Sequence, residues 1–232
     1  MEAIILAGGK AERLGDAAGG RPKALVPVAG RPLAAYQLGL LARAGVDRVL
    51  VSCAGGMGLT FEEELAYPGL DVVAVEEPEP LGRGGGLRFA AGARQEAGDV
   101  FALNGDELLD LDLSALYARH QETGAAATIT VTQPPSPFGV VELGDGDAVK
   151  GFDEAARVPY WVSCGVYVLG EEALDRLPER GDHESTTFPA LAAAGRLHAF
   201  RHDGVWITIN TPKDLRRAEE YVAAHPDWLQ VA

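Results

Sequence analysis

The sequence predicts an α/β fold, a three-layer sandwich in which helices cover a mostly parallel central sheet and a β-rich part is inserted or appended. Two observations support this prediction. In the first half of the chain, short β-branched runs alternate with longer segments of helical periodicity, as they do in open α/β sheets. From Pro134 onward, the pattern changes to strands that pair locally.

The first half contains five predicted strands and three predicted helices. The opening apolar run, residues 3–6, reads as a strand because Gly8 and Gly9 break it abruptly. A helix over residues 32–44 ends at Gly45, and one over residues 114–123 ends at Gly124. The remaining elements are strands at residues 48–53, 71–75, 100–104 and 127–132 and a helix at residues 84–95.

The second half begins with a predicted hairpin around the Gly-Asp-Gly-Asp turn at residues 144–147. Its strands are residues 138–143 and 149–152, and residues 160–169 form the longest strand candidate. Helices are expected at residues 171–177, 186–194 and 212–224. The last helix has a clear start, with Thr211 as N-cap and Pro212 at the first helical position.

Composition narrows the class of protein. The 232 residues are 47% hydrophobic and 23% charged, which suits one substantial core and excludes disordered and fibrous classes. A net charge of −14 argues against nucleic acid or an anionic membrane as a partner. No run is apolar enough to span a bilayer and no signal-peptide pattern occurs, so we expect a cytoplasmic protein. Cys53 and Cys164 lie in apolar runs and are expected to be buried thiols.

The first candidate site segment is Leu6-Ala7-Gly8-Gly9, where a strand ends in paired glycines at the carboxyl edge of the sheet. Ligands of open α/β sheets bind at this edge, and glycines allow a backbone to approach a phosphate or base closely. The alternative is a tight turn with no binding role, which would have the same sequence pattern. The segment is not a P-loop, because no Ser or Thr follows Lys10.

The second segment places Lys23 in a stiff loop between Pro22 and Pro27. A lysine presented in a defined direction can neutralise charge on a transferring phosphoryl group. The alternative is an exposed lysine that only aids solubility.

The third segment, residues 77–87, is a glycine-rich turn that opens a helix. Leu87 occupies the place of the third glycine of a dinucleotide fingerprint, so that motif is weak here. Either the helix N-terminus holds a ligand, or the glycines permit close packing of helix and sheet.

The fourth segment, residues 103–107, places Asp106 directly after a strand and so at the same sheet edge. A carboxylate there can hold Mg²⁺, which prefers one or two carboxylates, waters and substrate phosphates. A turn-forming or helix-capping Asp is the alternative.

Taken in order, these segments resemble those of the sugar-phosphate nucleotidyltransferases, also called NDP-sugar pyrophosphorylases, within the superfamily that includes the MobA-like transferases. The similarity runs through nearly the whole chain. It implies a Rossmann-like single domain over residues 1–232, with a nucleotide-binding half at 1–132 and an acceptor-binding half with the C-terminal helix at 133–232. It also implies that a sugar 1-phosphate attacks the α-phosphorus of an NTP and releases pyrophosphate. The matching segments are LAGGKAERL, PKALVPVAGRP, PLGRGGGL, NGD, GVYVL and WITINTPKDL.

The resemblance further implies roles for single residues. Arg13 would hold the pyrophosphate and Lys23 would bridge toward the α-phosphate. Asp106 would be catalytic by ligating Mg²⁺ or Mn²⁺, with Asn210 or Thr208 as candidates for a further ligand. The residues expected to bind the nucleotide are Leu6, Ala7, Gly8, Gly9, Glu77, Gly82 and Arg83. Those expected on the acceptor side are Gly139, Glu154 and Ser163.

The chain departs from the family pattern at functional positions. Ala155 stands where an EKP lysine often meets the sugar phosphate, and Thr208 replaces the second metal-binding Asp. Arg83 replaces the usual Thr and would add a cation beside the nucleotide. Two alternatives therefore stay open: a MobA-like transferase acting on a phosphorylated cofactor precursor, and a non-catalytic nucleotide-binding regulator. The expected partners are an NTP and a small phosphorylated acceptor, with the chain a monomer or a simple homodimer.

Overall fold

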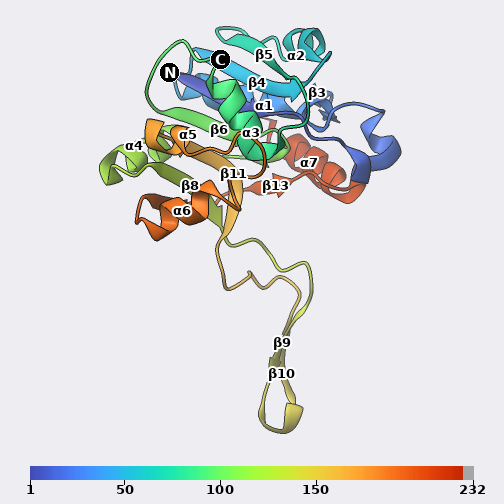
Figure 1. Cartoon of the computed structure of the whole chain (residues 1–232). Coiled ribbons are helices and arrows are strands. Elements are labelled where there is room, and N and C mark those ends of the chain that lie inside the picture. Colours follow the sequence, from blue (N-terminus) through green and yellow to red (C-terminus); the bar gives the residue numbers. More distant parts are fainter. Residues whose placement is uncertain (227–232) are drawn as a thin grey trace.

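The structure is a computed structural model that describes residues 1–226. A seven-stranded sheet with the strand order β12-β8-β11-β6-β1-β4-β5 forms its centre (Figure 1). Strand β11 runs antiparallel to both of its neighbours, and the other paired strands are parallel, so the predicted mostly parallel sheet is confirmed. The strands are β1 (Glu2–Leu6), β4 (Arg48–Ala54), β5 (Asp71–Glu77), β6 (Val100–Asn104), β8 (Ala127–Thr132), β11 (Val162–Leu169) and β12 (Leu197–Arg201).

Helices cover both faces of the sheet and give the three layers. Successive side chains of a strand point to opposite faces, so Ile4 and Ile5 of β1 belong to different cores. Ile5 packs with α1 (Leu33–Arg43), α2 (Gly58–Glu64) and α4 (Leu113–Thr123). Ile4 packs with α3 (Gly82–Ala91), α5 (Glu171–Asp175) and α6 (Thr187–Ala193).

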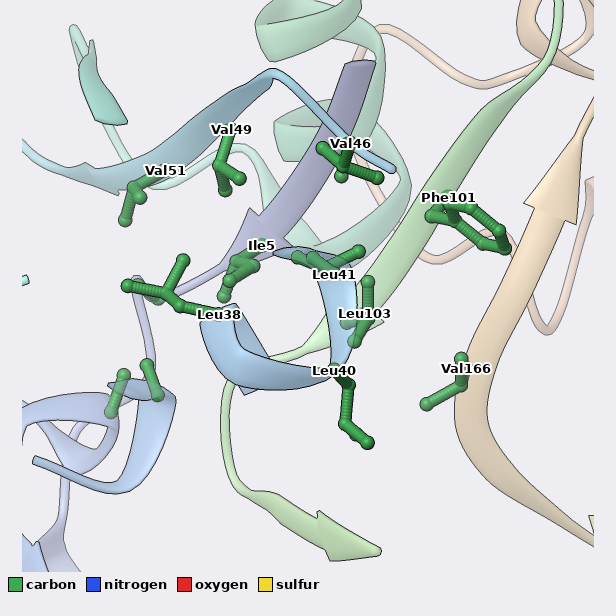
Figure 2. Close-up of a cluster of buried hydrophobic side chains, with 14 of the residues drawn as sticks. Ile5, Leu38, Leu40, Leu41, Val46, Val49, Val51, Phe101, Leu103 and Val166 are labelled. Atoms are coloured by element: carbon green, nitrogen blue, oxygen red, sulfur yellow. The ribbon is translucent and has the colours of Figure 1, made fainter. Parts of the chain in front are cut away.

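The larger core lies between α1 and the sheet (Figure 2). Leu38 and Leu41 of α1 meet Ile5, Val51 and Leu103 from three adjacent strands, and all five side chains are fully buried. Removing such a buried leucine costs about 2–5 kcal/mol, because the cavity left behind does not fully collapse. This packing fixes the strand ends that carry the candidate site.

A third apolar cluster joins distant parts of the chain beside the ends of β1 and β6. It contains Leu14, Val28, Ile207 and Leu215, which come from four separate elements. Strand β13 pairs antiparallel with β7 and sets Thr208 opposite Glu107. The elements concerned are η1 (Glu12–Ala18), η2 (Lys23–Leu25), β2 (Pro27–Val28), β3 (Arg31–Pro32), β7 (Glu107–Leu109), β13 (Trp206–Thr208) and α7 (Pro212–Ala224).

Residues 133–161 form an arm that projects from the body of the molecule (Figure 1). Its end is a hairpin of β9 (Val140–Leu143) and β10 (Val149–Asp153), joined by η3 (Asp145–Asp147). The predicted hairpin is confirmed. The other strands of the second half, β11, β12 and β13, lie in the body, so the β-rich part that stands apart is the arm.

Several predicted boundaries need correction. The helix predicted at residues 84–95 is α3, which begins at Gly82 and ends at Ala91. The short elements α2, β7 and β13 were not predicted, because a few residues carry too little periodicity. At α7 the predicted cap is confirmed: Thr211 and Asp214 form a capping box. Both cysteines are buried as predicted, and burial raises the pKa of Cys53 to about 11 and that of Cys164 to about 12.

Within residues 1–226, every helix is too short or too polar to cross a membrane.

Candidate active site

A cavity of about 630 Å³ lies at the carboxyl ends of β1, β4, β5 and β6. Its size is typical of small-molecule sites. Lys23 and Asp106 line it together with seven residues for which the sequence predicts nucleotide binding. Those seven are Leu6, Ala7, Gly8, Gly9, Glu77, Gly82 and Arg83.

Backbone hydrogen bonds bring the predicted segments together at this cavity. The amide of Gly105 donates to the carbonyl of Leu6 over 2.9 Å, and a Cβ at Gly105 would lie only 2.6 Å from that oxygen. Only glycine therefore allows the strand end before Asp106 to lie so close to the first loop. The amide of Lys23 donates to the carbonyl of Gly9 over 3.2 Å, which ties the second segment to the first.

Lys23 is a largely buried cation of the site with two side-chain partners. Its side chain is only 11% exposed, and Nζ donates to Oδ2 of Asp106 at 2.5 Å and to Oδ1 of Asn210 at 2.7 Å. The alternative of a solubilising surface lysine is therefore wrong. Because the ammonium is already ordered, little side-chain entropy remains to be lost when it meets a substrate.

Asn210 connects the two predicted cations. Its Oδ1 accepts from Lys23 and also from NH2 of Arg13 at 2.6 Å. Its Nδ2 donates to Oγ1 of Thr208 at 3.0 Å, and its amide donates to Asp214 in the capping box of α7. The structure thus brings both candidates for a further metal ligand to Asp106, but it engages their side chains in hydrogen bonds within the protein.

Glu107 is a functional candidate that the sequence reasoning passed over. Its carboxyl is buried, and Nε1 of Trp206 donates to it at 2.8 Å. Burial raises the pKa of Glu107 to about 8, and the neighbouring Asp106 carboxylate adds to the rise. The local signal is limited to a second carboxylate directly after Asp106, because the burial of Glu107 depends on Trp206, which is 99 positions away.

The glycine-rich turn is built for close packing. The amide of Gly84 donates to the carbonyl of Gly181 at 2.8 Å, and a Cβ at Gly84 would lie 2.7 Å from the ring of Pro178. A Cβ at Gly85 would lie 2.6 Å from the carbonyl oxygen of Glu179. The close packing named in the alternative prediction is present, with the 178–183 loop as well as the sheet as partner. Binding of a ligand at the N-terminus of α3 stays a prediction.

Glu77 holds the other end of this turn. Its Oε1 accepts from the hydroxyl of Ser52 at 2.7 Å, and its Oε2 accepts from the amide of Leu81 at 3.0 Å. Glu77 therefore lines the cavity with a carboxylate whose two oxygens already have partners.

Arg83 reaches the cavity with its charge balanced. Nε donates to Asp182 at 3.0 Å, and NH2 lies 2.7 Å from Oε2 of Glu184. Partial burial acts to raise the pKa of Asp182, but the hydrogen bonds from Arg83 and from the amide of Glu184, together with the charge of Arg83, hold the pKa below its usual value. The sequence predicts an additional free cation here, and the structure shows instead a guanidinium shared by two carboxylates.

The three predicted acceptor residues lie outside the cavity lining. Gly139 and Glu154 belong to the arm, where a Cβ at Gly139 would overlap the ring of Phe152. Ser163 lies on β11, and its Oγ accepts from the amide of Gly165 at 3.3 Å. Their predicted roles at the acceptor stay predictions.

The sequence reasoning also missed the contribution of β4. Ala54 ends this strand, Gly55 follows it, and both line the cavity. Their position could have been inferred, because β4 is the parallel neighbour of β1 and the carboxyl ends of parallel neighbours meet at one edge.

Comparison with known proteins agrees with the geometry. The family model described as nucleotidyl transferase matches residues 2–225. Among curated proteins, the mannose-1-phosphate guanylyltransferase catalytic subunit beta of Xenopus tropicalis is 31% identical over 100% of this chain and 68% of its own length. Mannose-1-phosphate guanylyltransferase of Mycobacterium tuberculosis is 32% identical over 94% of this chain and 63% of its own length. The chain therefore spans about two thirds of these relatives.

Two solved structures share the fold at low sequence identity. The inositol-1-phosphate CTP transferase from T. maritima has a TM-score of 0.77 and 21% identity, covering 100% of this chain and 97% of that one. HddC from Yersinia pseudotuberculosis, complexed with GMP-PN, has a TM-score of 0.72 and 21% identity, covering 95% of this chain and 98% of that one. On the family match along almost its whole described length, this chain belongs to the nucleotidyl transferase family, as the order of its motifs predicts.

Proposed function

We propose that this chain is a sugar-phosphate nucleotidyltransferase, which joins a nucleoside monophosphate from an NTP to a sugar 1-phosphate and releases pyrophosphate. The observation that carries the proposal is the position of Lys23, held between Asp106 and Asn210 at a cavity lined by the residues predicted for the nucleotide. The names of the curated relatives make GTP and mannose 1-phosphate the first pair to consider.

In the proposed reaction, a phosphate oxygen of the acceptor attacks the α-phosphorus of the NTP. A new P–O bond forms, the bond from the α-phosphorus to the bridging oxygen breaks, and pyrophosphate leaves with that electron pair. Catalysis of such a step rests on positioning and on neutralising negative charge. Lys23 is suited to the α-phosphate, and Arg13, which shares the Asn210 oxygen with it, is suited to the departing pyrophosphate.

A divalent metal ion is part of the proposal. Asp106 lines the cavity with a side chain that is 29% exposed. Across residues 1–226, no three His, Cys, Asp or Glu side chains gather to hold a metal. This arrangement fits Mg²⁺ or Mn²⁺ bound by one carboxylate together with waters and substrate phosphates. When bound, the ion would neutralise phosphate charge. Asp106 is the proposed ligand, because it offers a carboxylate, of which Lys23 engages one of the two oxygens, whereas Asn210 and Thr208 offer neutral oxygens that already accept hydrogen bonds.

We propose that the part of the cavity that receives the nucleobase recognises it through backbone groups. Both oxygens of Glu77 accept hydrogen bonds from the chain itself, so Glu77 would shape the turn at residues 78–82 that faces the nucleotide. Recognition by a shaped backbone pocket suits a base, which offers flat edges with donors and acceptors.

A substrate panel tests the proposal. The full chain is incubated with Mg²⁺, each of the five common NTPs and a set of sugar 1-phosphates that includes mannose 1-phosphate, and pyrophosphate release is followed. We expect turnover with at least one pair, with GTP and mannose 1-phosphate the leading pair. Asp106→Asn should lose most of the rate, whereas Asp203→Asn, a change at an exposed carboxylate outside the cavity lining, should retain it.

Two outcomes would contradict the proposal. Full activity of Asp106→Asn would remove the assigned metal ligand from the mechanism. Absence of turnover with every pair, in a folded sample, would exclude a sugar 1-phosphate among those tested and favour a phosphorylated cofactor precursor as acceptor.

A further inference from the structure

Gln37 is a buried polar residue of α1 that lies behind the candidate site. It is only 1% exposed, although glutamine is mostly found at protein surfaces. It is not among the residues that line the cavity, and its neighbours in α1, Leu38 and Leu41, pack in the larger core and hold the helix against the sheet. Burial of an amide costs free energy unless the amide is hydrogen-bonded, so the contacts of Gln37 indicate its role.

The amide nitrogen of Gln37 bridges the two ends of the turn that carries Asp106. Nε2 donates to the carbonyl of Asn104 at 2.7 Å and to the carbonyl of Glu107 at 2.9 Å. Asn104 ends β6 and Glu107 begins β7, so these carbonyls flank the turn formed by Gly105 and Asp106. Oε1 of Gln37 is buried with no hydrogen-bond partner within residues 1–226. The side chain is therefore placed for its two donors, at the cost of its acceptor.

Backbone hydrogen bonds hold the same turn on its other sides. The amide of Gly105 donates to the carbonyl of Leu6 at 2.9 Å, which ties the turn to the end of β1. The amide of Ile209 donates to the carbonyl of Asp106 at 3.0 Å, which ties it to the residues after β13. The amide of Gln37 adds the support from α1. The backbone of Asp106 thus has fixed partners from three parts of the chain.

We propose that Gln37 is a positioning residue for the metal ion of the transfer reaction, because it holds the turn at residues 104–107 so that the Asp106 carboxylate meets the ion in one orientation. The inference rests on the proposed function, since it takes Asp106 as the metal ligand. Mg²⁺ demands near-ideal octahedral geometry, and hydrogen-bonded groups behind a ligand contribute strongly to metal affinity. With a single carboxylate proposed as ligand, no second carboxylate compensates for an error in its position.

A purely structural role is the competing explanation, because loss of Gln37 leaves two carbonyls without this donor and lowers stability in either case. A control therefore needs the same kind of bond elsewhere in the chain. Thr187 of α6 provides it: the residue is 2% exposed, and its Oγ1 donates to the carbonyl of Arg176 at 2.9 Å, away from the cavity lining. Thr187→Val and Gln37→Met each remove a buried donor and keep the approximate side-chain shape, but only Gln37→Met releases the turn at Asp106.

Titration of the full chain with Mn²⁺ alone, followed by electron paramagnetic resonance of the free ion, tests the inference without a substrate. Asp106→Asn measures the background from other acidic groups, since the chain carries a net charge of −14. Gln37→Met, shown to be folded by circular dichroism, should lose about 10- to 100-fold in affinity at the Asp106-dependent site, whereas Thr187→Val should bind like the wild type. Gln37→Asn keeps the amide but is too short to reach both carbonyls, so it should also bind more weakly. Wild-type affinity in both Gln37 variants would overturn the inference.

The Mg²⁺ dependence of pyrophosphate release gives a second measurement. Gln37→Met should raise the Mg²⁺ concentration for half-maximal rate by a similar factor, and excess Mg²⁺ should restore most of the rate. A reduced rate with unchanged half-saturation by Mg²⁺ would show a structural role and contradict the inference.

The two measurements also separate this inference from the proposed function. Absence of turnover by the wild type would contradict the proposed function, while the Mn²⁺ affinities of Gln37→Met and Thr187→Val would still decide the role of Gln37. Equal Mn²⁺ binding by the wild type and Asp106→Asn would remove the metal ligand and overturn both.

Discussion

Nζ of Lys23 lies 2.7 Å from Oδ1 of Asn210, a residue 187 positions later in the chain. The same oxygen accepts from Arg13 at 2.6 Å, so one neutral amide orients the two cations proposed to meet the phosphates. Asn210 adds no negative charge to this pair of cations, so the Asp106 carboxylate alone offsets part of the charge of Lys23. The third apolar cluster brings η1 and α7 together. This packing places Arg13 beside Asn210.

Asn210→Ala should lower kcat/KM for the NTP by about 10- to 100-fold, the usual cost of losing a group that orients a ligand or catalytic side chain. Lys23 and Arg13 would lose their common acceptor, while the fold should survive. Asn210→Asp should raise KM for the NTP as well, because its negative charge offsets one cation. Steady-state kinetics at saturating acceptor measure both effects. An unchanged KM in Asn210→Asp would mean that these cations do not meet the phosphates.

The cap of α7 positions Asn210 and should influence both stability and function. Thr211→Ala removes the acceptor for the amide of Asp214 and should cost about 1 kcal/mol of unfolding free energy, measured by urea denaturation. Because the Asn210 amide donates to Asp214, KM for the NTP should rise too. Thr211→Ser, which keeps the hydroxyl, serves as the control and should resemble the wild type in both measurements.

Substitutions at two glycines should distinguish a role in packing from a role in ligand binding. Gly85→Ala places a methyl group 2.6 Å from the carbonyl oxygen of Glu179, so we expect a loss of about 1–3 kcal/mol in stability despite the better helix propensity of alanine. At Gly9 a Cβ has nothing within 4 Å, and this residue lines the cavity. Gly9→Ala should therefore keep the wild-type melting temperature and bind the NTP more weakly. Equal melting temperatures of Gly85→Ala and the wild type would contradict the packing role.

His183 should make the protein sensitive to acid. Its ring is buried between Tyr167 and Phe188, and among the described residues neither ring nitrogen has a hydrogen-bond partner. Burial lowers the pKa of His183 to about 4, despite the opposing effect of Glu184 and Asp182. Between pH 4 and 6.5 the unfolded chain binds the additional proton, so stability falls as the pH falls through this window.

The loss attributable to His183 should be on the order of 3 kcal/mol between pH 6.5 and pH 4. His183→Phe, which keeps an aromatic ring in the site, should lack this part of the pH dependence. Urea denaturation at a series of pH values compares the two proteins. Parallel curves would show that His183 does not contribute.

Much of the fold and of the nucleotide side could be predicted from the sequence, because local patterns determine them. The alternation of apolar runs and helical segments predicted strands such as β1 and β6, and the glycines after them predicted where these strands end. Three of the predicted segments converge because carboxyl ends of parallel strands share one edge, and the hydrogen bond from the amide of Lys23 to Gly9 adds the fourth. The capping box of α7 was equally local, since Thr211 and Asp214 lie within one turn.

Other features depend on contacts between distant residues and could not be predicted. Nothing in the sequence near Arg83 shows that Asp182 and Glu184 balance its charge, because they lie about a hundred positions away. The burial of Glu107 depends on Trp206 from β13, a strand too short to recognise by periodicity. The placement of Gly139 and Glu154 on a projecting arm depends on backbone hydrogen bonds between residues 134–136 and 156–158, which no local pattern indicates.

The most direct test of the central claim is the rate of pyrophosphate release from the productive NTP and sugar 1-phosphate pair by the wild type and by Lys23→Met, each shown to be folded. Removing one preorganised cation from the reacting phosphate should lower kcat by about 100-fold or more. Lys23→Arg, which keeps the charge but changes its geometry, should fall between the two. A Lys23→Met protein with wild-type kcat and KM would contradict the assignment of Lys23 to the transferred phosphate.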